Sequence, residues 1–228
     1  MKYDVIIVGA GPGGIYSAYE LMKKCSDKKI AVFDSGYSLK KRHCPIDGEK
    51  VKACIKCKSC SIMSGFGGAG AFSDGKYNIT NDFGGTLYEY IGKKAATELM
   101  QYVDDINMAH GGEGTKMYST AGTNLKKVCL QNRLKLLNAS VRHLGTDINL
   151  VVLGRLYDEL KEHVDFYFES PVSHIECLEN GGYRVWSNDK SYDCEKCIVS
   201  VGRSGSKWME HICKELDIPT KSNRVDIG

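Results

Sequence analysis

Six residues near the start of the chain, Gly9-Ala10-Gly11-Pro12-Gly13-Gly14, restrict what this sequence can fold into more than any other feature. They follow the apolar, β-branched run Tyr3–Val8, which is typical of a strand buried on both faces. Helically spaced apolar residues over Gly13–Cys25 come next, and then a second short apolar run, Lys29–Asp34. Strand, helix and strand in this order form a βαβ unit, so the sequence predicts a parallel sheet with a right-handed crossover.

The glycine run satisfies the pattern GxGxxG, in which each glycine has its own physical role. Gly9 permits the tight turn, Gly11 lets the backbone approach a pyrophosphate, and Gly14 lets the helix pack closely on the strand. The N-terminus of the helix presents free N–H groups to an anion. Asp34 lies 20 residues after Gly14, at the end of the second strand, where it can accept hydrogen bonds from ribose hydroxyls.

This pattern predicts a dinucleotide site, and its alternative is a tight turn that binds nothing, with Asp34 a solvated turn residue. The glycines do not choose between FAD and NAD, and the acidic residue argues only against the 2′-phosphate of NADP. The predicted cofactor-binding residues at this end of the chain are Gly9, Ala10, Gly11, Pro12, Gly13, Gly14, Asp34 and Ser35.

Composition places the chain among ordinary globular proteins. Of its 228 residues, 42% are apolar and 26% are charged, and 31 basic against 28 acidic residues give a net charge of +3. This balance is far from that of a dedicated nucleic-acid-binding protein. No stretch approaches the roughly 20 apolar residues of a membrane helix, and the first residues lack the apolar core of a secretory signal. We expect a cytoplasmic protein with no nucleic-acid or membrane partner.

The rest of the chain changes from loop to helix to strand. Residues 36–86 have the composition of a loop, and three amphipathic helices are predicted over Tyr88–Asn107, Leu125–Leu137 and Val151–Glu162. Strands are then predicted over 165–178, 183–187, 190–194 and 197–201, with turn signals at Asn180-Gly181-Gly182 and Asn188-Asp189. The fold class expected is α/β, a Rossmann-like parallel sheet plus a β-meander, with a mostly helical insertion.

Four of the ten cysteines lie close together in the predicted loop, at Cys44, Cys54, Cys57 and Cys60. Two successive C-x2-C spacings can place thiolates around one centre, as in an iron–sulfur cluster or a zinc site. A redox-active thiol pair beside a flavin is an alternative, favoured by neighbouring lysines that would lower the thiol pKa, and unliganded thiols in a basic loop are a further interpretation. A further C-x2-C pair, Cys194 and Cys197, is expected to be structural.

Motifs spread along the chain resemble one family. They are the glycine run with Asp34, GFGGAGAFSDGK over Gly65–Lys76, RHLGTD over Arg142–Asp147 and VGRSG over Val201–Gly205. Together they resemble the uncharacterised FAD-dependent dehydrogenases, which are similar in fold to flavoproteins of the glutathione-reductase and fumarate-reductase type. The resemblance implies FAD with its pyrophosphate on the glycine run and its ribose at Asp34. It also implies that Val172 lies near the adenine and Gly202 near the cofactor.

The resemblance implies a discontinuous FAD-binding domain, residues 1–90 and 164–228, and a helical insertion, residues 91–163, that forms part of a substrate domain. No Gly-Asp motif for the ribityl chain of the flavin follows Gly205, so we expect the N-terminal portion of a longer protein. The implied function is an FAD-dependent oxidoreductase, a dehydrogenase or reductase of a small organic substrate with an electron donor or acceptor. The alternatives are a non-catalytic nucleotide- or metal-binding module and an NAD-dependent enzyme.

Few side chains qualify for a catalytic role. Arg142 and His143 could orient an anionic or carbonyl substrate, but Arg142 could equally pair with an acidic neighbour while His143 caps the loop. The basic cluster Lys40-Lys41-Arg42 could contact the pyrophosphate or belong to a solvated loop. The sequence identifies no catalytic residue, substrate or oligomeric state.

Overall fold

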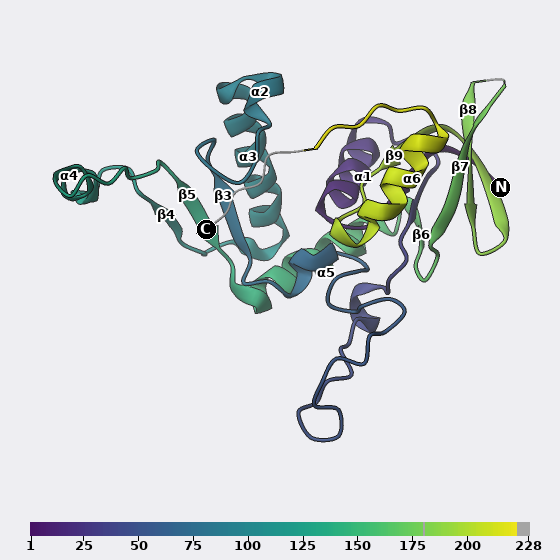
Figure 1. Ribbon diagram of the computed structural model, residues 1–228, viewed down its shortest axis with the longest axis horizontal. Coiled ribbons are helices and arrows are strands. Elements are labelled where there is room, and N and C mark those ends of the chain that lie inside the picture. The colour runs from purple at the N-terminus through teal and green to yellow at the C-terminus, as the bar shows by residue number, and fades with distance from the viewer. Residues whose placement is uncertain (180, 223–228) are drawn as a thin grey trace. The chain divides into compact units, whose positions relative to one another are not determined.

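The computed structural model describes residues 1–179 and 181–222 (Figure 1). The chain divides into two compact units: unit 1 comprises residues 1–70 and the chain from residue 159 onward, and unit 2 comprises residues 71–158. Asn180 of a predicted turn, and residues 223–228 of the predicted FAD-binding domain, lie outside the described residues.

Unit 1 is built on a six-stranded sheet in the order β6-β2-β1-β9-β8-β7. β1 pairs in parallel with both β2 and β9, and β2 pairs in parallel with β6. β7, β8 and β9 form an antiparallel meander, so the predicted α/β fold with a parallel sheet and a meander is confirmed. The bounds are Lys2–Val8 (β1), Ile30–Phe33 (β2), Val164–Tyr167 (β6), Val172–Leu178 (β7), Gly182–Ser187 (β8) and Lys190–Val199 (β9).

Helices cover both faces of this sheet. Ile6 and Ile7 of β1 are fully buried and point to opposite faces, because successive strand residues alternate. α1 (Pro12–Lys24) packs on the face of Ile7, and α6 (Ser206–Glu215) contributes Ile212 to the cluster that contains Ile6. Two-sided burial explains why β1 has a continuous apolar run.

Two strand predictions are corrected. The predicted strand 165–178 is divided into β6 and β7, because Glu169 adopts a left-handed backbone (φ 54°) before Pro171. Residues 190–201 were expected to form two strands, but β9 runs unbroken from Lys190 to Val199. It pairs with β8 along its first half and with β1 along most of its length, and so it joins the meander to the parallel strands.

Unit 2 contains a three-stranded antiparallel sheet in the order β3-β5-β4. Residues 71–90, which were predicted to belong to the cofactor domain, lie in unit 2. They include β3, which pairs with β5 of that unit. The bounds in and beside this unit are Lys76–Ile79 (β3), Met117–Ser119 (β4), Ser140–His143 (β5), Tyr88–Ile91 (α2), Lys93–Asn107 (α3), Leu125–Gln131 (α4) and Gly145–Leu160 (α5).

Three helix predictions are also corrected in extent. The helix expected over 88–107 is divided into α2 and α3 at Gly92, whose φ of 82° is outside the helical region. α4 is shorter than expected because Arg133 has a left-handed φ of 58° just beyond its end. α5 begins six residues before Val151. None of the helices among the described residues has the length and apolar character needed to cross a membrane.

Candidate cofactor site

Unit 1 contains a cavity of about 930 Å³ where its parallel strands end. Val8 is paired with Phe33 of β2 and with Val199 of β9, so the carboxyl ends of these strands meet at one edge. Open α/β sheets bind ligands at this edge, where connections leave in opposite directions. The walls come from the β1–α1 turn, the end of β2, the start of β7 and segments 57–70 and 200–208.

Of the three glycines of the GxGxxG pattern, two lie where the fold excludes a side chain and one lies where a Cβ would make only an ordinary contact. Gly9 has a φ of 104°, and a Cβ there would lie 2.5 Å from the carbonyl oxygen of Ser200. A Cβ on Gly14 would lie 1.9 Å from the carbonyl oxygen of Gly9. At Gly11 the nearest atom to such a Cβ is 3.9 Å away, the Cα of Gly68. Gly11 therefore leaves room beside the backbone, as the close approach of a pyrophosphate requires.

Asp34 lies at the end of β2 and its carboxylate fixes the turn. The N–H of Ala10 donates to Oδ2 and the N–H of Gly36 donates to Oδ1, each over 2.7 Å. An ionised carboxylate can accept about four hydrogen bonds. Asp34, which lines the cavity, therefore retains the capacity to accept ribose hydroxyls.

The second glycine-rich run, Gly65–Gly70, is a packed loop. Phe66 is fully buried, with its ring 5.7 Å edge-on from that of Phe166. The N–H of Gly67 donates to the carbonyl of Ala10 over 2.8 Å, so this loop lies against the β1–α1 turn. Its small residues border the cavity with backbone, which suits contact with a flat ligand.

Arg42 fills neither role that the sequence suggested for the basic cluster. It is only 5% exposed and donates to the carbonyl oxygens of Ser61, Phe66 and Ile62 over 2.6–2.8 Å. Burial lowers the pKa of its guanidinium, while Asp34 favours its charged form. Arg42 therefore holds the cavity wall in place and is not a ligand for phosphate.

The cavity gathers eight of the ten predicted cofactor residues. Ala10 and Gly14 are not among the described lining residues, and their backbones support the turn behind it. The eight are Gly9, Gly11, Pro12, Gly13, Asp34, Ser35, Val172 and Gly202. Cofactor binding by all ten stays a prediction.

Sequence reasoning missed several other residues of the lining. Lys58 and Arg203 contribute positive charge, and Pro171 and Trp208 contribute apolar surface. Trp208 follows VGRSG by three residues, and this proximity was the one signal available in the sequence.

The four clustered cysteines are not gathered around one centre. Across residues 1–179 and 181–222, no three His, Cys, Asp or Glu side chains are grouped closely enough to hold a metal ion. Cys57 and Cys60 line the cavity, whereas Cys44 and Cys54 are not among its lining residues. The iron–sulfur and zinc interpretations receive no support from this geometry.

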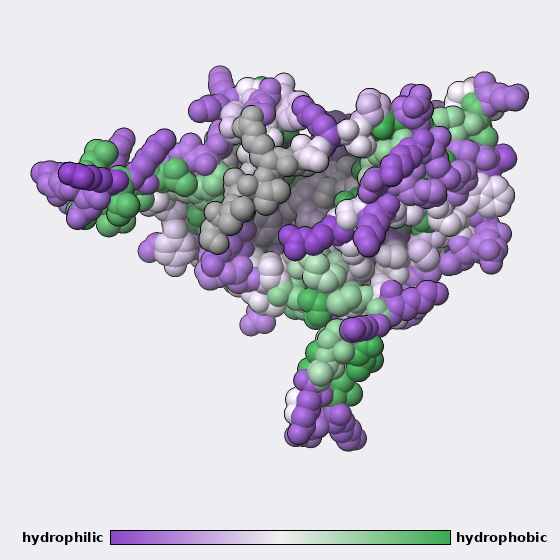
Figure 2. Space-filling view, viewed as in Figure 1, coloured by the Kyte–Doolittle hydropathy of each residue, from purple (hydrophilic) through white to green (hydrophobic). Residues whose placement is uncertain are grey.

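These cysteines belong to a segment with both basic and apolar exposed side chains, drawn dark blue below the sheet in Figure 1. Figure 2 shows hydrophilic and hydrophobic surface side by side on this segment. Ile55, beside Cys54, is 59% exposed. The interpretations as a redox pair or as unliganded thiols stay open.

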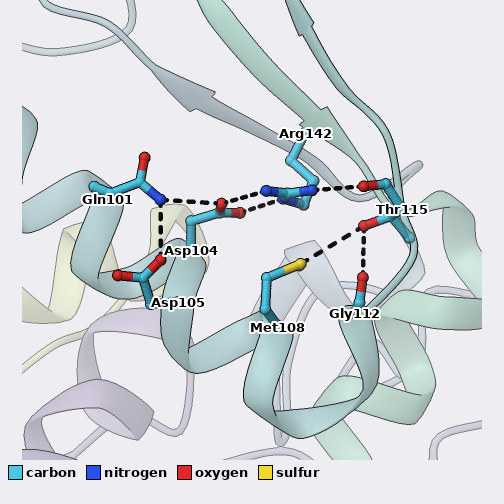
Figure 3. A network of polar contacts seen from close by, with 7 residues as sticks. All are labelled: Gln101, Asp104, Asp105, Met108, Gly112, Thr115 and Arg142. Carbon is cyan, nitrogen blue, oxygen red and sulfur yellow. Dashed lines mark hydrogen bonds and ion pairs between the residues drawn. The ribbon is translucent and has the colours of Figure 1, made fainter.

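In unit 2, Arg142 pairs with an acidic residue (Figure 3). Its Nε and Nη2 donate to the two carboxylate oxygens of Asp104 over 2.7 and 2.8 Å, and Nη1 donates to the carbonyl of Thr115 over 2.6 Å. Asp104 is 1% exposed, and its hydrogen bond raises the pKa of Arg142. The network gives Arg142 a structural role and provides no support for orientation of a substrate. His143 ends β5 instead of capping a loop, and it is exposed.

Several solved structures have a similar fold. Glycine oxidase from Geobacillus kaustophilus superposes with a TM-score of 0.51 at 15% identity, over 95% of this chain and 58% of that protein. The amino acid oxidase NikD gives 0.50 at 9% identity, over 94% and 54%. L-α-glycerophosphate oxidase from Mycoplasma pneumoniae, solved with FAD bound, gives 0.50 at 14% identity, over 94% and 57%.

The fold is that of the FAD-binding domains of flavoprotein oxidases. No family model matches the chain. A curated protein of Clostridium beijerinckii, itself uncharacterised, is 24% identical over 217 residues, which are 94% of this chain and 34% of that protein. The chain thus spans about a third of the length of this relative and little more than half of the oxidases. At these identities the likeness extends to the fold alone.

Proposed function

We propose that unit 1 binds FAD and that the chain is the cofactor-binding part of an FAD-dependent oxidoreductase. The observation that carries this proposal is the position of Gly11, where a Cβ would make only one ordinary contact and which lines the cavity one strand away from the carboxylate of Asp34. A volume of about 930 Å³ lies at the upper end of the range for ligand pockets, about 300–1,000 Å³. The likeness in fold to flavoprotein oxidases supports the same choice.

Different residues of unit 1 suit different parts of FAD. N–H groups of the first turn of α1 bind the pyrophosphate, because a helix N-terminus has unpaired donors and a positive dipole end. Lys58 and Arg203 complement its negative charge, and Asp34 accepts the ribose hydroxyls. When bound, FAD supplies hydride or electron transfer, and the chain binds and orients it.

Unit 2 and the chemistry beyond the cofactor belong to the same proposal. We assign the insertion to a substrate domain, with a small organic substrate and an electron donor or acceptor as partners. A dehydrogenase or reductase activity and a cytoplasmic location stay predictions. The catalytic residues are unassigned, because the network around Arg142 gives that side chain a structural partner.

A spectrum of the purified chain, with the released cofactor identified after denaturation, tests this proposal. We expect the absorption bands of a flavin, FAD in the supernatant, and loss of the bands on anaerobic reduction with dithionite. If the chain is colourless, we expect added FAD to be retained after gel filtration. A chain that retains NAD instead favours the NAD-dependent alternative. A chain that binds FAD but exchanges no electrons with any donor or acceptor favours the non-catalytic module.

A further inference from the structure

We infer that Trp208 binds the adenine of the dinucleotide and makes the cavity select adenine dinucleotides over flavin mononucleotide. This inference rests on the proposed function and deepens it. Trp208 lies in the first turn of α6, after the segment Gly202–Gly205, and lines the cavity.

The indole of Trp208 is held in place from one side. Its Nε1–H donates to the carbonyl of Ser173 over 3.3 Å, and the side chain is half-buried. Trp208 also packs against the core cluster that contains Ile6, so a hydrogen bond and packing together hold the ring at the cavity wall. The ring therefore needs little ordering when a flat ligand binds, and ordering side chains is one of the costs of binding.

A short stretch of chain links Asp34 to Trp208. The N–H of Ser170 donates to the backbone carbonyl of Asp34 over 2.9 Å. From there Pro171 and Val172 line the cavity up to Ser173, which holds the indole. Three residues of extended chain span about 10 Å, a distance comparable to the length of an adenosine. A ribose bound at Asp34 therefore places its base near Trp208.

The cavity wall differs in chemistry from place to place. Around Trp208 it has apolar side chains, Pro171, Val172 and the indole itself, whereas segment 65–70 contributes small residues, with Gly68 against Gly11. An adenine stacks on an aromatic face, and the small residues leave room for the bulkier isoalloxazine. Flavin mononucleotide has no adenine to offer the indole.

The chain has only two tryptophans, Trp186 and Trp208, which makes the test direct. Trp186 is not among the described residues that line the cavity. In W186F the tryptophan fluorescence comes from Trp208 alone, and we expect AMP to quench this fluorescence. In W208F the emission comes from Trp186, and we expect AMP to leave it unchanged. Because AMP contains no flavin, this readout does not depend on activity or on a loaded enzyme.

Equilibrium binding of FAD separates an adenine contact from general packing. We expect W208L to bind FAD about tenfold more weakly than the wild type, as for loss of one base–aromatic stack, and W208F to recover most of the affinity. Affinity for flavin mononucleotide should be the same in all three proteins. Circular dichroism of each variant verifies folding, and if W208L does not fold, the AMP comparison of W186F and W208F decides.

Two outcomes overturn the inference in different ways. If W208L binds FAD as tightly as the wild type, or if AMP quenches W208F as strongly as W186F, Trp208 does not bind adenine and the proposed function stands. If the wild type binds neither FAD nor AMP, the inference and the proposed function fail together.

Discussion

The cavity of unit 1 and the arginine network of unit 2 each contain a carboxylate, but its charge is used differently in the two places. Asp34 accepts backbone N–H groups at 2.7 Å and borders open space. Asp104 is buried and both its oxygens are bound by the guanidinium of Arg142. A buried charge needs a partner within the protein, whereas a carboxylate at a cavity wall can also bind a ligand. The comparison separates a carboxylate that borders a cavity from one whose two oxygens are both used to hold the fold together.

The same contrast applies to the two arginines beside these sites. Arg42 bonds to backbone carbonyls of the cavity wall, and Arg142 bonds to a carboxylate and one carbonyl. Both guanidinium groups stabilise structure, although each was a candidate for binding a ligand. The backbone of the glycine turn and Asp34, by contrast, line the cavity.

The largest difference in stability is expected between variants of Gly14, where the fold requires a glycine, and variants of Gly11, where it does not. In Gly14→Ala the new methyl would lie 1.9 Å from the carbonyl oxygen of Gly9, so helix and strand must move apart. We expect a loss of more than about 4 kcal/mol in the free energy of unfolding, a size reserved for severe disruption. Chemical denaturation measures it. Equal stability of Gly14→Ala and the wild type would refute the packing role.

The network of unit 2 should depend strongly on both partners. Asp104→Asn leaves the guanidinium of Arg142 without its counter-charge, and breaking a buried pair costs about 3–5 kcal/mol. Asp105→Asn, at an exposed neighbour, should change stability by less than about 0.5 kcal/mol. Denaturation curves of the two variants provide the comparison, and similar losses in both would argue against a special role for the buried pair.

Arg42 clamps the cavity wall through its three hydrogen bonds to backbone carbonyls. Loss of this clamp should have an intermediate effect on stability and a second effect on FAD binding. Arg42→Met leaves three carbonyls of the wall without their charged donor, and we expect a loss of about 2–3 kcal/mol. FAD binding should weaken as well, because segment 57–70 forms part of the cavity. Lys41→Met is the control, since the side chain of Lys41 is 72% exposed. If Lys41→Met weakened binding as much, surface charge and not the clamp would be responsible.

The smallest effect is expected at a pair that belongs to neither site, Asp193 and Arg184 on the meander. Arg184 donates to both carboxylate oxygens over 2.6 and 3.0 Å and lowers the pKa of Asp193. The unfolded pKa is about 3.9, so the pair stabilises the fold above that pH and this contribution disappears as pH falls through the lower, folded value. Thermal unfolding of the wild type and Asp193→Asn should therefore differ slightly at pH 7 and converge in acid. A difference that grows in acid would contradict the sign.

The sequence predicted the parallel strands and the glycine turn because their determinants are local. The spacing of Gly9, Gly11 and Gly14 encodes backbone clearances that need no knowledge of distant residues. The continuity of β9 was not predictable, because it depends on pairing with β1 far away in the chain. Gly92 could have indicated the division between α2 and α3, whereas the left-handed turn at Arg133 has no such signal.

The hydrogen-bond and ion-pair partners of the side chains could not be predicted from the sequence. Arg142 and Asp104 are 38 positions apart, and Arg42 reaches carbonyls about 20 positions away. Nothing in a motif such as RHLGTD specifies whether its arginine faces a ligand or a buried acid. Trp208 was missed for the same reason, since its place beside the cavity depends on how α6 packs.

Titration of the chain with FAD, for the wild type and Gly11→Val side by side, tests the central claim most directly. A Cβ at Gly11 makes one ordinary contact, 3.9 Å from the Cα of Gly68, and the side chain of a valine there fills the space assigned to the pyrophosphate. We predict saturable binding of one FAD per wild-type chain, and affinity at least about tenfold weaker in Gly11→Val, with similar circular dichroism spectra. Equal affinity in both proteins, or no saturable binding by the wild type, would contradict the assignment of this cavity to FAD.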